Sequence, residues 1–400
     1  MRPSTDDGPP VADEPLLADL LDAIERELPR AVELRHRLHE RPELAHAEHG
    51  TAALVAEEMP VACQSVAGTG LIARVGAADG APVAVRAELD GLPVRERTGA
   101  PFSASGETMH ACGHDVHMAA LVALARAAHG LAERLPVPLL AVFQPSEEAY
   151  PSGAQQLAQD ALAQIAPLAV VGAHVHPELR WGDVALDAGA VNASCDAVEI
   201  TVEGESTHGA YPHHGHDPIL ALAQVIVALH AQVGRSIDPL HPASLTVGVI
   251  AGGTAENVIP GRASARAALR AHRPQDRARL REMVEEVVAG VSAAHGCRGS
   301  VVLMEGEPVL ENDAQIVAGA RMLLAQAQLQ TAAEWRSCGS DDFAFFGEVA
   351  PLAMAFVGLD GAAGFERRPL HHPELLVPDE AVGTVARVLA VLYMAAALST

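Results

Sequence analysis

Apolar residues recur along this chain with two different periods, and these periods predict an alternation of helices and strands. From Leu16 to Leu28 they are spaced by three and four residues, which predicts a helix over residues 16–39 that ends before Pro42. The helical period returns at residues 51–59, 116–129 and 381–398. Short apolar runs predict buried strands at residues 71–75, 83–87, 139–143 and 169–171. This alternation indicates an α/β fold with a mostly parallel central sheet.

The pattern changes between residues 192 and 304. Strands are predicted at 196–202, 244–250, 263–269 and 299–304, and helices at 218–233 and 274–295. Their order, β-α-β-β-α-β, is that of a ferredoxin-like unit, whose antiparallel sheet has an edge free to pair with another copy of the chain. A helix at 313–326 and a strand at 352–357 then resume the earlier alternation. We therefore expect a disordered N-terminus (1–15), a discontinuous main domain (16–191 and 305–400) and an inserted domain (192–304).

Composition narrows the possible partners and chemistry. The net charge of −24 argues against nucleic acid or an anionic membrane surface as a partner. All 27 basic residues are arginine, which excludes lysine Schiff-base and P-loop chemistry. The five cysteines show no paired spacing and there is no signal peptide, so we expect free thiols and a cytoplasmic location. The apolar stretch 381–398 is interrupted by Arg387 and is short for a bilayer span, which favours a buried helix.

The densest chemistry lies in residues 110–117, which read His-Ala-Cys-Gly-His-Asp-Val-His. Cys112 and His114 are two residues apart, so in an extended or tight-loop segment both side chains can face one point. A thiolate and an imidazole suit zinc, cobalt or manganese rather than calcium. A buried cysteine among surface histidines would be an equally good interpretation of this pair taken alone.

Further candidate ligands follow other predicted elements. Adjacent carboxylates, Glu147 and Glu148, come after strand 139–143, and they cannot face the same way, so one can bind a metal while the other takes a different role. His174 follows strand 169–171, and His371 precedes the final helix. Any one of these residues alone is more often structural. Together they form a possible ligand set for two metal ions, namely Cys112, His114, Glu148, His174 and His371.

At this level of detail the chain resembles the M20 metallopeptidase family, in the aminoacylase/amidohydrolase branch that includes hippurate and auxin-conjugate hydrolases. The matching stretches are residues 35–44, 86–93, 110–117, 143–148, 152–154, 172–175, 204–218, 252–260, 339–343 and 370–373. The motif His-Ala-Cys-Gly-His-Asp is specific to this branch, because other members have aspartate at the place of Cys112. The sequence departs from the family at Glu88, where aspartate is common, at Ser206-Thr207, where glycines are common, and at Ala149-Tyr150-Pro151, which follows the paired glutamates.

The resemblance implies a dinuclear metal-dependent hydrolase of N-acyl-amino acids, with two divalent ions (Zn²⁺, Mn²⁺ or Co²⁺) per subunit. It assigns the five candidates above as ligands and Glu147 as the general base. It implies that the inserted domain is a lid that forms a homodimer. His208 would stabilise the oxyanion, in its own subunit or in its partner's, and Asn257 and Arg270 would contact the substrate.

The sequence leaves two other functions possible, and it does not decide the role of Asp90. A dipeptidase or carboxypeptidase could use the same scaffold, and a metal-binding module without catalytic activity could use the same ligands. Glu147 argues against the second, because a storage site needs no non-ligand carboxylate beside its ligands. Asp90, at the end of strand 83–87, would either orient a ligand imidazole or cap a turn.

Overall fold

The computed structural model describes residues 14–77 and 79–399, which form two compact units. The first comprises the described residues up to Gly189 together with Asn312–Trp335 and Phe345 onward, and the second comprises Ala190–Glu311 and Arg336–Ala344. The segment 336–344, expected in the main domain, belongs to the second unit because Ala193 N–H donates to the carbonyls of Ser337 and Gly339. Of the N-terminal segment expected to be disordered, residues 14 and 15 lie in a helix and the rest lies outside the described residues.

A mixed sheet with the strand order β1-β2-β4-β3-β5-β16-β6-β15 forms the centre of the first unit. Its neighbours β4, β3, β5 and β16 are parallel, while β2 pairs with β4, and β6 with β16, in the antiparallel sense. The mostly parallel α/β fold is therefore confirmed. The strands are β1 Gln64–Val66, β2 Gly70–Val75, β3 Val83–Glu88, β4 Leu139–Gln144, β5 Ala169–Arg180, β6 Asp183–Ala185, β15 Gln330–Thr331 and β16 Leu352–Asp360.

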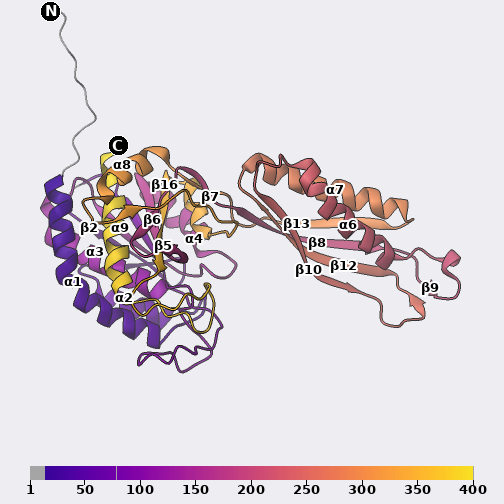
Figure 1. Ribbon diagram of the computed structural model, residues 1–400, viewed down its shortest axis with the longest axis horizontal. Helices are drawn as coiled ribbons and strands as arrows, with labels where there is room; N and C mark the ends of the chain where they lie inside the picture. The colour runs from indigo at the N-terminus through magenta and orange to yellow at the C-terminus, as the bar shows by residue number, and fades with distance from the viewer. Residues whose placement is uncertain (1–13, 78, 400) are drawn as a thin grey trace, which may run out of the picture. The chain divides into compact units, whose positions relative to one another are not determined.

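Helices cover this sheet (Figure 1). The helices α3 and α9 pack directly against its central strands, and α1 packs against both α3 and α9. The helical segments are α1 Glu14–Glu40, α2 His49–Glu58, α3 His114–Gly130, η1 Ala132–Arg134, α4 Gly153–Leu157, η2 Ala158–Leu162, α5 Ala163–Ile165, α8 Ala314–Leu324, η4 Asp342–Glu348 and α9 Glu380–Leu398. The helix α9 is long and apolar enough to cross a membrane, but it is almost wholly buried in the core, as predicted. The residue Tyr393 is fully buried there, and its hydroxyl donates to Val137 O at 2.5 Å.

The second unit is built on an antiparallel sheet with the strand order β10-β12-β8-β13, and its elements follow one another as β-α-β-β-α-β. Alternate residues of β8, namely Val198, Ile200 and Val202, are buried in the apolar core that the sheet forms with its two long helices. The elements are β8 Ser194–Glu203, α6 Pro218–Ser236, β10 Ala243–Gly252, β12 Arg262–Ala271, α7 Pro274–Ala294 and β13 Arg298–Met304. Short segments complete it: β7 Gly189–Asn192, β9 Thr207–His208, η3 Pro212–His214, β11 Val258–Ile259 and β14 Leu310–Asn312.

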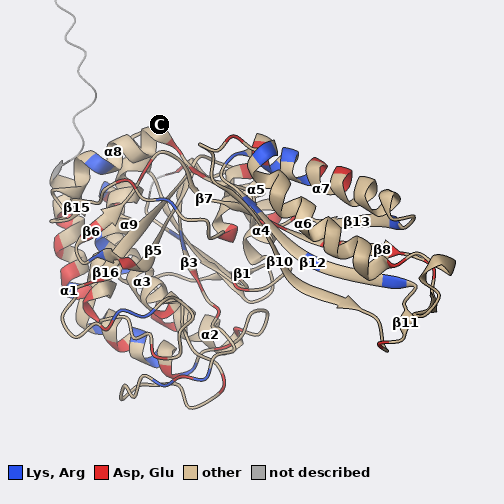
Figure 2. Cartoon of the chain, turned by 45° about the vertical axis from the view of Figure 1, so that its right-hand side comes forward, with Lys and Arg blue, Asp and Glu red and all other residues tan. Residues whose placement is uncertain are grey.

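Charged residues of both signs lie along α7, arginines in its first turns and glutamates after them (Figure 2). Arg279 lies 3.2 Å from Glu282 and 3.1 Å from Glu286 there. Such exposed pairs keep a helix soluble and add little to stability. None of the five cysteines forms a disulfide, so the prediction of free thiols is confirmed.

Candidate metal centre

The predicted metal ligands come from four segments of the first unit. The loop after residue 109 and the start of α3 supply Cys112 and His114, and the turn after β4 supplies Glu148. His174 lies within β5, which was predicted to end at residue 171. The strand continues to Arg180 because His174 still pairs with Phe356 of β16. The fourth segment, between β16 and α9, supplies His371.

The structure brings these side chains together. The Sγ atom of Cys112 lies 3.4 Å from Nε2 of His174. The Nε2 atom of His371 lies 3.1 Å from Oε1 of Glu148, and one ligand atom from each of Cys112, Glu148 and His371 falls within 4.8 Å of the others. A second group consists of His114, Glu147 and Glu148. Glu148 belongs to both groups, so two neighbouring ions could share it.

The surroundings of the ligand atoms also fit a bound metal ion, independently of the sequence motif. Nδ1 of His114 donates to the carbonyl of Asp90 at 2.9 Å, which leaves the Nε2 lone pair of the same ring available. Nε2 of His114 is buried and has no hydrogen-bond partner among the described residues, and Oε1 of Glu148 is buried with His371 as its near neighbour. Buried polar atoms normally have a partner, and thiolate, imidazole and carboxylate ligands suit a borderline divalent ion such as zinc.

The electrostatics of the site favour neutral imidazoles at two positions. Burial keeps the pKa of His117 and of His174 well below the usual range. Burial also acts to lower the pKa of His114, but the contact with Asp90, whose carboxylate lies 3.7 Å away, outweighs it and raises that pKa. Since a ligand imidazole must lose its proton, metal binding at His114 will compete with protonation.

Asp90 serves the site in two ways. Its backbone carbonyl orients His114, as one of the two sequence interpretations proposed, and its carboxylate accepts the backbone N–H of Glu148 at 2.9 Å. Although burial alone would raise the pKa of Asp90, the His114 ring near its carboxylate and the backbone N–H of Glu148 lower it. Asp90 is fully buried and ties the end of β3 to the turn that carries both glutamates.

That turn has a left-handed backbone. Ser146 has φ +51°, which is unusual for a residue with a side chain. Its N–H donates to the carboxylate of Glu48 at 2.8 Å, and its hydroxyl accepts the N–H of His46 at 2.8 Å. Gly153 has to be glycine, because a Cβ there would lie 1.8 Å from the carbonyl of Pro145. Glu48 was not among the predicted residues, because its only signal in the sequence is its place near the 35–44 motif.

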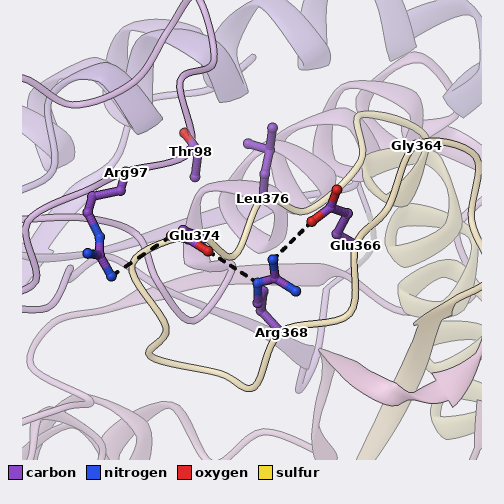
Figure 3. A pocket seen from close by; sticks show the side chains of 7 residues that line it. All are labelled: Arg97, Thr98, Gly364, Glu366, Arg368, Glu374 and Leu376. Atoms are coloured by element: carbon purple, nitrogen blue, oxygen red, sulfur yellow. Dashed lines mark hydrogen bonds and ion pairs between the residues drawn. The ribbon is translucent and has the colours of Figure 1, made fainter.

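The loop that carries His371 is tied down from two sides. His371 has φ +66°, and its N–H donates to Ala111 O at 2.8 Å. Arg97 N–H donates to Pro373 O at 2.7 Å. A small pocket beside this loop is crossed by ion pairs of Glu374 with Arg368 and Arg97 (Figure 3). These pairs lie at the surface and contribute mainly to the order of the loop.

A buried ionic network anchors the start of α3 to α1. Asp115 accepts from Arg35 at 2.9 Å and contacts His39 at 2.9 Å, and His39 also lies 3.1 Å from Glu96. Burial would lower the pKa of His39, but Asp115 and then Glu96 outweigh it and raise the pKa to about 9. This network fixes the residue next to His114, and nothing in the sequence apart from the family motifs pointed to it.

Three predicted residues lie in the second unit, and only two of them are close together. His208, on β9, pairs with Val258, and the N–H of Gly209 donates to Asn257 O at 2.7 Å. The ten-residue strand β12 begins shortly after β11, and Arg270 lies near the far, C-terminal end of β12. There it donates to Cys338 O at 2.8 Å. Roughly 26 Å of strand, at about 3.3 Å per residue, separates it from the start of β12.

Comparison with known proteins identifies relatives across most of the chain. Residues 84–395 match the model of peptidase family M20/M25/M40. An N-acetyl-L-cysteine deacetylase from Bacillus subtilis is 34% identical over 90% of this chain and 86% of its own length. An N-acetyldiaminopimelate deacetylase from Bacillus pumilus is 30% identical over 90% of this chain and 96% of its own length.

Solved structures give the same result. A putative aminohydrolase from methicillin-resistant Staphylococcus aureus superposes with a TM-score of 0.89 at 25% identity, covering 94% of this chain and 98% of its own. A dinuclear metal-binding peptidase of the M20 family from Bacillus subtilis superposes with a TM-score of 0.81 at 28% identity, covering 92% and 98% of the two chains.

Proposed function

The chain belongs to peptidase family M20/M25/M40 and is a hydrolase. We propose that it hydrolyses the amide bond of N-acyl-amino acids, releasing a carboxylic acid and a free amino acid. The observation that carries this proposal is the placement of Glu147 beside Glu148 in a partly buried cluster of thiolate, imidazole and carboxylate side chains. The deacetylase names of the relatives support an N-acyl-amino acid, with acetyl as the first acyl group to test.

We propose that two divalent ions bind to Cys112, His114, Glu148, His174 and His371, with Zn²⁺, Mn²⁺ and Co²⁺ as the candidates. Bound there, they would lower the pKa of a bound water toward about 7. The protein then has to position a base and exclude bulk water. Glu147, whose side chain is 13% exposed, lies 3.9 Å from Nε2 of His114, at the edge of the ligand cluster.

In this proposal Glu147 takes the proton from the attacking water and returns it to the leaving amine. A positioned carboxylate in such a role contributes roughly 10²–10⁴-fold to the rate. The adjacent Glu148 cannot share this role, because Asp90 holds its backbone N–H and its Oε1 faces His371. The backbone conformation of the turn after β4 thus gives the two adjacent glutamates different roles, Glu147 as the base and Glu148 as a ligand.

We further propose that the inserted ferredoxin-like unit is a lid through which the chain forms a homodimer. Two exposed apolar features support this interface. The helix α6 exposes Ile219, Leu220 and Val227 opposite its buried face. The strand β10, which pairs only with β12 among the described strands, exposes Val249 and Ile250 at the edge of its sheet. Such an edge can pair with a second copy of itself.

His208 and Asn257 would then serve a metal site, either that of their own subunit or that of the partner subunit. Ala193, close to the point at which the chain enters the second unit, bonds to Ser337, and Ser194 pairs with Ala271 at the Arg270 end of the sheet. About 30 Å of β8 therefore separates this connection from the segment that carries His208. We propose that His208 stabilises the oxyanion, a contact typically worth about 3 kcal/mol, and that Arg270 binds the substrate carboxylate.

A substrate panel tests the activity. Protein reconstituted with Zn²⁺, Mn²⁺ or Co²⁺ would be assayed against N-acetyl-cysteine, N-acetyldiaminopimelate, benzoyl-glycine and a set of unblocked dipeptides, with Glu147→Gln as the control. We expect N-acyl-amino acids to give the highest kcat/KM. Preferential cleavage of dipeptides would establish the dipeptidase alternative, and a fully metallated but inactive protein would establish a binding module.

A further inference from the structure

The third histidine of the 110–117 motif, His117, lies within the cluster but makes two hydrogen bonds that define its role. It is fully buried on the first turns of α3. Its Nδ1 lies 2.8 Å from Oε2 of Glu88, and its Nε2 accepts the backbone N–H of Val175 at 3.1 Å. Glu88 is in turn bound by the guanidinium of Arg86, which also donates to Gln144 at 2.8 Å.

These contacts fix one tautomer of the ring. A backbone N–H can only donate, so Nε2 of His117 must carry its lone pair toward Val175. A carboxylate can only accept, so Nδ1 of His117 carries the proton and donates it to Glu88. Both ring nitrogens are therefore engaged. Although His117 falls within ligand distance of Glu88, His114 and His174, it has no lone pair left for a metal ion.

His117 holds the N–H of Val175, and the carbonyl of the same residue, in the next peptide group, orients His174. The Val175 carbonyl lies 2.7 Å from Nδ1 of His174, which turns Nε2 of that ring toward Sγ of Cys112, 3.4 Å away. The Val175 side chain also packs on the backbone between the first two ligands. A Cβ on Gly113 would lie 2.6 Å from Cγ2 of Val175. Val175 thus contacts the backbone between Cys112 and His114 through its side chain, and His174 through its carbonyl.

We propose that His117 is a positioning residue, which together with Glu88 fixes the backbone of Val175 and thereby the metal-binding direction of His174. This inference rests on the proposed metal site. It also gives a role to Glu88, which stands where the family commonly has aspartate, because the longer side chain reaches Nδ1 of a histidine on the neighbouring helix.

Two amide substitutions distinguish a positioning role from a ligand. In His117→Gln the side-chain carbonyl can take the place of Nε2 and accept from Val175, whereas in His117→Asn the shorter side chain reaches only the place of Nδ1. Zn²⁺ affinity would be measured by competition with a chromophoric chelator, and the Co²⁺ absorption spectrum would report the thiolate and imidazole ligands. The exposed His129→Asn, on the same helix, is the matched control.

We expect His117→Asn and His117→Ala to weaken metal affinity roughly 10–100-fold, as losses around metal ligands commonly do. His117→Gln should stay within a few-fold of wild type and keep the Co²⁺ spectrum, and the control should be unchanged. Equal losses in the Gln and Asn variants would make His117 a ligand and overturn the inference. Unchanged affinity in all variants, with only a lower Tm, would overturn it as well. A wild-type protein that binds no metal would overturn the proposed function together with this inference.

Discussion

The carboxylate of Glu48 accepts the backbone N–H of Ser146 at 2.8 Å, one residue before the proposed base. Glu48 is fully buried, and it also accepts from the hydroxyl of Thr69 at 2.6 Å. Its described partners are the hydroxyl of Thr69 and the N–H and hydroxyl of Ser146, and these bonds hold the turn in the left-handed region. The direction in which the Glu147 side chain points therefore depends on Glu48, a residue 99 positions earlier in the chain.

Replacing Glu48 should impair catalysis more than metal binding. In Glu48→Ala the N–H of Ser146 loses its acceptor and the turn can relax, and a displacement of about 1 Å can cost roughly 10²-fold in rate. We expect kcat to fall by about that factor while the metal content stays within a few-fold. Glu43→Ala, which removes a carboxylate that caps α2, is the control for general destabilisation. Equal kcat in the two variants would contradict the assignment.

Glu147→Gln keeps the size of the side chain and removes its proton transfer. We expect kcat to fall by roughly 10²–10⁴-fold with an unchanged metal complement, measured by steady-state kinetics and elemental analysis. The prediction fails if activity remains within a factor of a few.

Cys112→Ala removes the thiolate from the cluster. It should reduce the bound metal and the activity together while the far-UV spectrum is preserved, because the ligand lies in a loop rather than in the sheet. Cys338→Ala removes an exposed thiol in the second unit and serves as the control. A full metal complement in Cys112→Ala would show that Cys112 is not a ligand.

Stability should depend on pH through His39. Its pKa is about 9 in the folded protein and about 6.5 when unfolded, so its stabilising contribution is complete below about pH 6.5 and is lost as the pH rises through about 9. At about 1.4 kcal/mol per pKa unit the contribution is at most about 3–4 kcal/mol. We expect the difference in unfolding free energy between wild type and His39→Gln to shrink between pH 6 and pH 10, as measured in urea. A difference that is constant over this range would show that His39 is not charged in the folded protein.

Mixed dimers test whether His208 acts on the partner's site. Subunits carrying His208→Ala and subunits carrying Glu147→Gln should each be nearly inactive. After exchange, one site of each heterodimer would combine an intact base with an intact lid histidine, which restores up to about half of the wild-type activity per dimer. If proven heterodimers stay inactive, His208 acts in its own subunit or has no catalytic role.

The sequence alone determined the architecture and the set of candidate ligands. Helices and strands follow from the two hydrophobic periods, since burial on one face requires apolar residues every three to four or every two positions. The order β-α-β-β-α-β of the second unit was readable for the same reason, and Cys112, His114, Glu148, His174 and His371 each stood at the end of a recognisable element or motif. The length of β5 was underestimated, because its pairing with β16 continues past the apolar run.

Only the tertiary structure decided how these ligands are held. Glu48 and His117 are buried polar residues whose hydrogen-bond partners, Ser146 and Val175, lie 98 and 58 residues away. No local period records such a contact, because it depends on where the sheet places two distant backbone groups. The folded chain also separates Arg270 from His208, which the sequence could only place in the same inserted domain. Periodicity reports which face of an element is buried, whereas the direction of a buried donor or acceptor is set by the packing of elements against one another.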